Sequence, residues 1–315
     1  MDNMKNKKIA KIILYLLFYC IPFVDSFSGL LVKFNFAAIG GLGAVTQIVK
    51  GCILLLCLYF YINNTNFINA HLLFMFISIS LFFILFISLI FGTLFTSIKI
   101  DFLIFYKIFY LILIFLFFNK IIKAKFISCD KLINLFITNG IICSLLIIIT
   151  TILKINFSTY DNTFFGTRGL FLSGNGIGVY LGAISFLALI VSQKFPTLIN
   201  RCKGLFLVCI NMIIGTKASL IFLIVGLLYF TLCIARIGKL IIPIAIFICF
   251  QKAVFTTVFE VVLFRIKNTT GILEQIFGGR MPYLEYAFSV FDTDGPLSLR
   301  IVTGLGPYLN FRLPN

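Results

Sequence analysis

Long apolar segments, separated by short polar ones, dominate this chain. Many of them reach the roughly 20 residues that a helix needs to cross the hydrocarbon core of a bilayer. The alternation of apolar and polar residues typical of membrane β-strands is absent, which favours helices over a barrel. The pattern predicts an all-α, polytopic integral membrane protein with about nine transmembrane helices. They are expected at residues 9–24, 45–62, 72–91, 100–118, 132–153, 170–191, 205–214, 218–235 and 240–258.

Two segments depart from this pattern. Residues 25–44 contain Gly40-Gly41-Leu42-Gly43, and this glycine content predicts a re-entrant or extracytoplasmic segment rather than a helix. The helix expected at residues 205–214 is short for a full span and is alternatively a half-helix. A crossing is favoured, because without it Arg236 and Lys239 would face the wrong side.

The amino-acid composition of the chain changes near residue 259. Residues 1–258 are expected to form the transmembrane domain. Residues 259–315 mix charged positions with Gly278-Gly279 and Gly304-Leu305-Gly306, which predicts a large extracytoplasmic loop.

Composition agrees with a membrane protein and sets its orientation. The 315 residues are 61% hydrophobic and 11% charged, against about 45–50% and about 25% in soluble domains. The net charge of +16 would suggest nucleic acid in a soluble protein. Here lysine and arginine cluster before the first helix and after the helices at 100–118, 170–191 and 218–235. The positive-inside rule therefore places these segments in the cytoplasm, and no nucleic-acid partner is expected.

The nine cysteines lack the spacing of a metal site or a disulfide framework. We therefore expect no metal and no cofactor. The default location for such a chain is the inner membrane of a bacterium, with a cytoplasmic N-terminus.

Three cations are expected on the outer face, where the positive-inside rule does not explain them: Arg168, Lys217 and Arg280. The first two are expected at the N-terminal ends of helices. A helix N-terminus carries a partial positive charge, so a cation placed there is favourable only when both share an anion.

Glycines beside these cations allow the backbone to approach a ligand closely. The group predicts a phosphate or pyrophosphate site. The competing interpretation of each cation alone is a side chain that snorkels to the membrane boundary. Within the apolar segments, Lys50 and Lys107 are expected to snorkel or to pair with Asp101.

Three motifs carry a resemblance to a known family. Residues 168–178, Arg-Gly-Leu-Phe-Leu-Ser-Gly-Asn-Gly-Ile-Gly, resemble the element that opens a middle helix in bacterial O-antigen polymerases and the related O-antigen ligases. Residues 214–219, Ile-Gly-Thr-Lys-Ala-Ser, resemble a second element of that family, in which arginine is commoner than lysine. Residues 278–283 and 304–306 resemble two short sequence motifs in the large periplasmic loop of that family.

The resemblance implies a polysaccharide polymerase at the periplasmic face. It would join oligosaccharide repeat units carried on undecaprenyl pyrophosphate, by glycosyl transfer. The implied partners are this lipid-linked oligosaccharide, the lipid bilayer, a chain-length regulator and a flippase. Arg168, Lys217 and Arg280 would bind the pyrophosphate and stabilise it as it leaves. Substrate contacts would fall on Gly169, Asn175, Gly215, Thr216 and Tyr283.

The general base stays open among outer-face carboxylates. The candidates are Asp161 and Glu285, together with Glu274, Asp292 and Asp294. Ligases of the family use a loop histidine, whereas His71, the only histidine of this chain, is expected at the cytoplasmic edge. This difference favours a polymerase over a ligase.

Two other functions remain as alternatives. A lipid-linked oligosaccharide flippase or transporter would show ionisable or broken helices near the midplane and two similar halves. The sequence shows no similarity between its halves, and acidic residues are almost absent from the expected helices. A membrane sensor or assembly subunit is the third alternative. Members of the resembled family commonly continue with further helices after the large loop, so this chain is expected to be shorter than its relatives.

Overall fold

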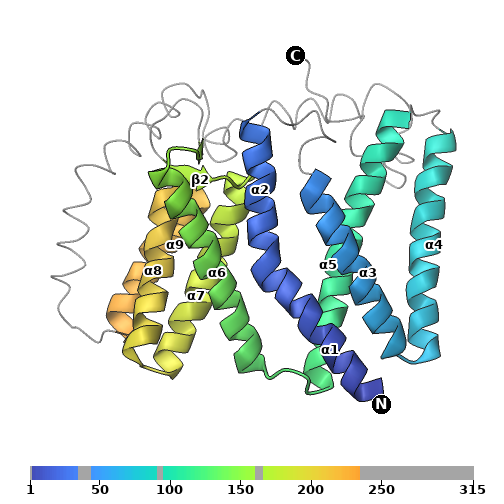
Figure 1. The fold of residues 1–315 in the computed structure, drawn as a ribbon, viewed down its shortest axis with the longest axis horizontal. Coiled ribbons are helices and arrows are strands. Elements are labelled where there is room, and N and C mark those ends of the chain that lie inside the picture. Colours follow the sequence, from blue (N-terminus) through green and yellow to red (C-terminus); the bar gives the residue numbers. More distant parts are fainter. Residues whose placement is uncertain (1, 35–43, 91–94, 160–165, 235–315) are drawn as a thin grey trace, which may run out of the picture. The chain divides into compact units, whose positions relative to one another are not determined.

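The computed structural model describes residues 2–34, 44–90, 95–159 and 166–234 (Figure 1). Helices make up nearly all of this part of the chain, and one short hairpin interrupts them. The elements are α1 (Asp2–Tyr15), the π-helical turn η1 (Leu16–Cys20), α2 (Ile21–Lys33), α3 (Ala44–Asn63), α4 (Phe67–Ile90), α5 (Phe95–Lys123), α6 (Cys129–Ile152), β1 (Phe157–Ser158), β2 (Thr167–Gly169), α7 (Gly174–Lys194), α8 (Leu198–Ile214), α9 (Lys217–Tyr229) and a second π-helical turn, η3 (Phe230–Ile234).

Several of these helices indicate an integral membrane protein. Among the described residues, five are long and apolar enough to cross a membrane: Asn6–Lys33, Val45–Asn63, Phe105–Lys123, Cys129–Ile152 and Gly174–Lys194. Two shorter apolar helices are His71–Phe82 and Ala218–Ile234. The predicted helical membrane class is therefore confirmed. The expected helix at 240–258 and the expected loop at 259–315 lie outside the described residues, so the count of nine stays a prediction.

The described chain falls into two compact units. One contains residues 2–34, 44–56, 121–159 and 166–234, and the other contains residues 57–90 and 95–120. In the second unit, the fully buried rings of Phe60 and Phe117 pack edge to face, with centroids 5.2 Å apart. All described candidate site residues belong to the first unit.

The first helical segment is longer than its hydropathy predicts. The expected end at residue 24 is wrong, because the helix continues through Asp25 to Lys33. The polar residues that weaken the apolar pattern are satisfied by α3: Asp25 pairs with Lys50 at 3.4 Å, and the hydroxyls of Ser28 and Thr46 lie 2.8 Å apart. Residues 25–33 therefore continue the first apolar helix, which is long enough to cross a membrane, and do not form a separate re-entrant segment. Lys50 pairs with Asp25, and the side chain of Asp101 lies outside the described part of the structure.

One backbone hydrogen bond is missing from this helical segment, and a side chain of α6 replaces it. Pro22 has no N–H, so the carbonyl of Phe18, four residues earlier, loses its usual helical donor. The side-chain amide of Asn139 donates to that carbonyl at 2.7 Å. The hydroxyl of Tyr180 on α7 in turn donates to the side-chain oxygen of Asn139. One buried network thus joins three helical segments, where an unpaired carbonyl in lipid would be costly.

Small side chains allow α7 to pack closely against its neighbours α6, α8 and α9. Such residues are typical of helix interfaces in membranes, where apolar burial gives little driving force. The closest approach is at Gly182, where a Cβ atom would lie 2.1 Å from the ring of Phe222. The buried small residues of α7 are Gly174, Gly178, Gly182, Ser185, Ala188 and Ser192.

The expected start of the next helix at residue 205 is wrong. In the structure α8 begins at Leu198, after Thr197, whose hydroxyl accepts from the backbone N–H of Asn200. Its first turns contain Arg201 and Lys203, which lower the local hydropathy although they are helical. The 17 residues of α8 rise about 25 Å, which favours a crossing over a half-helix.

Candidate anion-binding site

A short β-hairpin sits at one end of the first unit, between α6 and α7 (Figure 1). Phe157 pairs with Gly169 and Ser158 with Thr167, in antiparallel register with an irregularity between the two pairs. The buried hydroxyl of Thr167 organises the hairpin. It accepts from the side-chain amide of Asn156 at 2.7 Å and donates to the carbonyl of Phe157 at 3.2 Å. Two-residue and three-residue strands leave too little alternation for a sequence pattern to predict them.

The hairpin places Arg168 at the edge of the helices. Along β2 the residues Thr167 and Gly169 are buried, whereas Arg168 between them is half-buried, as expected when successive residues of a strand face opposite sides. Gly169 has a φ of 59°, a conformation that favours glycine. A Cβ atom there would lie 2.9 Å from the hydroxyl of Thr150 on α6. The hairpin is therefore held tightly against α6 on one side and presents Arg168 on the other.

The guanidinium of Arg168 is fixed by three neighbours. Its Nη1 donates to the carbonyl of Leu172 at 2.8 Å, and its central carbon lies 5.4 Å from the centroid of the Phe157 ring. The aliphatic stem passes over Gly174, where a Cβ atom would lie 3.4 Å from Cδ of Arg168. Its Nε is buried and has no hydrogen-bond partner among the described residues. A ligand is one way to satisfy such a group. Nε of Arg201 on α8 is also buried without a partner among the described residues, so the feature that distinguishes Arg168 is its place beside the first turn of α7.

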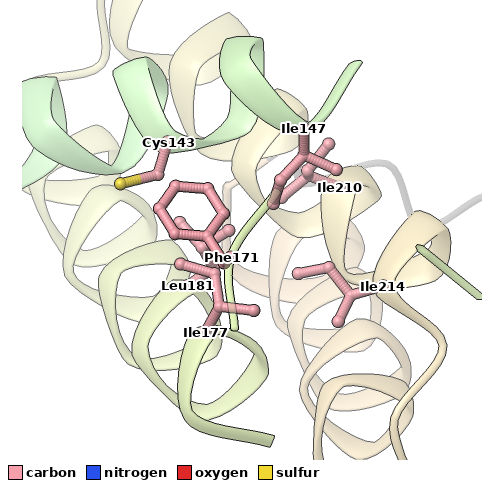
Figure 2. Close-up of a cluster of buried hydrophobic side chains, with 7 residues drawn as sticks. All are labelled: Cys143, Ile147, Phe171, Ile177, Leu181, Ile210 and Ile214. Carbon is pink, nitrogen blue, oxygen red and sulfur yellow. The ribbon is translucent and has the colours of Figure 1, made fainter. Parts of the chain in front are cut away.

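The expected start of α7 at residue 170 is wrong, and Arg168 is not the first residue of a helix. The helix begins at Gly174, after Ser173, whose hydroxyl accepts from the backbone N–H of Gly176 at 3.1 Å. The intervening residues dock the chain, because Phe171 is buried in a cluster formed by α6, α7 and α8. Figure 2 shows this cluster, which contains Cys143, Ile147, Phe171, Ile177, Leu181, Ile210 and Ile214.

The α8–α9 turn lies beside the same end of α7. Gly215 ends α8 with a φ of 67°, and Thr216 caps α9 by accepting from the backbone N–H of Ser219 at 3.1 Å. A Cβ atom at Gly178 would lie 2.6 Å from the hydroxyl oxygen of Thr216. The hairpin also reaches this turn, because the hydroxyl of Thr159 donates to the carbonyl of Ile214 at 2.7 Å. The first turns of α7 and α9 are thus neighbours.

These contacts bring several of the predicted site residues to one end of the unit. Arg168 and Gly169 lie in the hairpin, Asn175 is exposed in the first turn of α7, and Lys217 is the first residue of α9. Gly215 and Thr216 are buried in the turn, and the Thr216 hydroxyl is engaged in the helix cap. Asp161, Arg280, Tyr283 and Glu285 lie outside the described residues.

Sequence reasoning missed one cation at this site. Lys33, the last residue of α2, donates from Nζ to the carbonyl of Asn156 at 2.5 Å and lies 5.5 Å from the centroid of the Phe157 ring. The sequence alone gave little signal for this position, because the polar residues of α2 are satisfied only by contacts with α3. The glycine-rich sequence that follows also suggested an earlier end of the helix.

The arrangement can bind an anion by charge and by hydrogen bonds. Lys33 and Arg168, and the N-terminal ends of α7 and α9, lie at the same polar end of the apolar helices.

Comparisons of this chain with protein-family models, with curated proteins and with solved structures give no match in any of the three.

Proposed function

We propose that this chain is a polysaccharide polymerase that joins lipid-linked oligosaccharide units at the outer face of a bacterial inner membrane. The observation that carries the proposal is the position of Arg168. The hairpin holds its guanidinium beside the first turn of α7, with Nε unpartnered within the described residues. This geometry suits a phosphate or pyrophosphate, and the sequence motifs around it resemble those of O-antigen polymerases.

The distribution of charge supports the orientation. Since α2 ends at the hairpin and α7 starts beside it, the start of α1 and the end of α7 belong to the opposite end of the first unit. That end is rich in cations, as the positive-inside rule expects of a cytoplasmic face. Its basic residues are Lys7, Lys8, Lys11, Lys131, Lys194, Arg201 and Lys203. The hairpin end would then face the periplasm.

In the proposed reaction, a hydroxyl oxygen of the acceptor unit attacks the anomeric carbon of the donor sugar. The new glycosidic bond forms as the bond from that carbon to the pyrophosphate oxygen breaks, and the electron pair leaves with the lipid pyrophosphate. A carboxylate takes the hydroxyl proton, and Asp161 and Glu285 remain the candidates. Arg168 would stabilise the charge that develops on the leaving group, with Lys217 and Arg280 as further ligands.

A second candidate, a flippase or other transporter of lipid-linked oligosaccharides, has one observation in its favour. Asp25 and Lys50 form an ion pair between two membrane helices, and both side chains are about one third exposed. Ionisable groups within membrane helices often mark a transport pathway. The pair lies on α2 and α3 and has no recorded contact with Arg168, so the site geometry favours the polymerase.

The test replaces Arg168 with glutamine in cells that make the polymer. We expect long polysaccharide to fall by on the order of 10²–10³, the loss typical of removing one preorganised stabiliser of a leaving group. Single repeat units should still reach the cell surface. Polymer length is read on a gel, and protein abundance is measured in the same membranes.

Arg201→Gln is the matched control, since it removes an arginine from the opposite end of the unit. A normal polymer in the Arg168→Gln strain would contradict the proposal. Repeat units trapped on the cytoplasmic side would instead support the transporter.

A further inference from the structure

Lys33 and Arg168 come from distant parts of the sequence and share one aromatic ring. Nζ of Lys33 lies 5.5 Å from the centroid of Phe157, and the guanidinium carbon of Arg168 lies 5.4 Å from it. The separation of the two charges therefore cannot exceed the sum of these distances, which a diphosphate with its hydrogen bonds can span. Both cations therefore contact one side chain, which links α2 to the hairpin at this position.

The packing of α2 explains why Lys33 reaches this ring. Gly29 lies four residues before Lys33 and therefore on the same face of the helix. Gly29 touches the backbone of Leu170 so closely that a Cβ atom would lie 1.7 Å from that carbonyl oxygen. Because this contact fixes the distance of α2 from the hairpin, the next turn brings Lys33 over Asn156 and Phe157.

Neither cation is neutralised within the described residues. The two ion pairs of that part of the chain join Asp25 to Lys50 and Asp130 to Lys194. Two like charges held close repel, and the negative face of a phenyl ring offsets this only in part. Donors also remain available: a lysine has three and an arginine five, and Nε of Arg168 is buried without a partner.

A simpler role for Lys33 is a snorkelling anchor at the helix end, where a cation also suits the helix dipole. An anchor would extend toward the headgroups and would need no fixed geometry. Lys33 instead turns toward the hairpin, and Nζ donates to the carbonyl of Asn156 at 2.5 Å. The ammonium is held in a fixed position near the Phe157 ring that the Arg168 guanidinium also approaches, as a ligand-binding group would be.

We infer that Lys33 and Arg168 form one two-cation site for the diphosphate group of a lipid carrier, with Phe157 holding both side chains in place. The inference deepens the proposed function and rests on it for the identity of the carrier. The diphosphate itself is selected by the two cations and their free donors. The site lies where α2 ends, at the level expected for a lipid headgroup.

The experiment measures binding to the full chain in lipid nanodiscs. The two probes are a polyprenyl diphosphate within the nanodisc and inorganic pyrophosphate in solution. The variants are Lys33→Gln, Arg168→Gln, the double variant and Lys33→Arg. Lys154→Gln is the matched control. Lys154 is an exposed cation between the end of α6 and the hairpin, and it makes no cation–π contact with Phe157.

We expect each single glutamine variant to weaken polyprenyl diphosphate binding by about tenfold or more, as for loss of a charge-assisted hydrogen bond. The double variant should lose less than the product of the two single effects, because both side chains bind the same group. Lys33→Arg should retain most of the affinity, and Lys154→Gln should match the wild type. Binding of both probes would mean that the phosphoryl group suffices, and binding of the lipid alone would assign recognition to the headgroup in the membrane.

Unchanged binding in Lys33→Gln, or strictly multiplicative effects in the double variant, would overturn the inference. Binding that depends on Lys33, in a protein whose Arg168→Gln variant still makes normal polymer, would support the site and reject the polymerase. Loss of polymer in Arg168→Gln, with full binding in Lys33→Gln, would support the polymerase and reject the two-cation site.

Discussion

At the residue scale, Gly29 shows how one missing side chain sets the position of a helix. Its α-carbon faces the carbonyl of Leu170, and a Cβ atom there would lie 1.7 Å from the oxygen and 2.7 Å from the carbonyl carbon. Both atoms belong to the backbone and cannot move away by a change of rotamer. The close approach of α2 to the hairpin, and with it the place of Lys33, therefore depends on glycine.

Gly29→Ala should destabilise the protein in spite of its favourable effect on the helix. Alanine gains about 1 kcal/mol of helix propensity over glycine, whereas overpacking costs about 1–3 kcal/mol. With a backbone atom as the obstacle, the larger figure applies, and the melting temperature in detergent should fall. The same variant should bind polyprenyl diphosphate more weakly, because Lys33 moves away from Phe157.

Gly204→Ala is the control for this prediction. A Cβ atom at Gly204 would first meet a methyl group of Leu189 at 3.2 Å, which can move by a few tenths of an ångström. Its effect on the melting temperature should therefore be small. Equal melting temperatures for Gly29→Ala and the wild type would show that α2 is not held against the hairpin as described.

At the scale of elements, the hydrogen bond that replaces the one lost at Pro22 joins the first helical segment to α6. The carbonyl of Phe18 has Asn139 as its donor, since Pro22 cannot supply one. Asn139 is 6% exposed, so water cannot take its place. Removing the amide takes away the hydrogen bond that this carbonyl accepts from α6.

Asn139→Leu should therefore lower the free energy of unfolding by about 1–2 kcal/mol, the range for hydrogen bonds between membrane helices. Pro22→Ala restores a backbone N–H that can donate to Phe18, so the loss should shrink when both changes are combined. Thermal unfolding of the four proteins in one detergent measures this cycle. Strict additivity would contradict the link between Pro22 and Asn139.

Thr138→Val is the control for Asn139→Leu. Thr138 is the neighbouring polar residue on α6, it is half-buried, and its hydroxyl donates to the carbonyl of Asn134 within the same helix. Its replacement should leave the stability within about 0.5 kcal/mol of the wild type. A larger effect would show that the stability measurement responds to any polar change on α6.

At the scale of the whole molecule, the proposed orientation makes the two ends of the first unit chemically distinct. Cys129 and Cys202 are exposed at the cation-rich end, whereas Lys154 is exposed beside the hairpin. A membrane-impermeant maleimide should react with the two native cysteines only in inverted membrane vesicles. A protein in which all nine native cysteines are replaced with serine and Lys154 with cysteine should react only in right-side-out vesicles. The opposite result would invert the topology and remove the periplasmic site.

Hydropathy predicted those helices whose ends are marked by local chemistry. The helix expected at 45–62 is observed at Ala44–Asn63, and the one expected at 132–153 is observed at Cys129–Ile152. In each case a long, mostly apolar run is bounded by polar residues or glycines. The turn at Gly215 and Thr216 was equally visible, since glycine ends a helix and threonine begins one.

Part of the candidate site was visible in the same way. Arg168, Gly169, Asn175, Gly215, Thr216 and Lys217 were selected from the sequence, and the structure brings their backbones to one end of the first unit. Lys33 was missed because its place depends on where α2 ends and on what it touches. The helix was cut short because Asp25 and Ser28 count as polar in any local window, although α3 satisfies both.

The sequence by itself determined that this protein is helical and spans a membrane, because length, apolar content and charged flanks are local properties that each segment carries alone. It also located a cation among glycines before a helix. Only the tertiary structure decided that Arg168 lies on a strand, that α2 continues to Lys33, and that both cations meet at Phe157. Those outcomes depend on contacts between segments far apart in the chain: a hydroxyl that closes a hairpin, a glycine that admits a carbonyl, and an amide that replaces the donor that proline lacks.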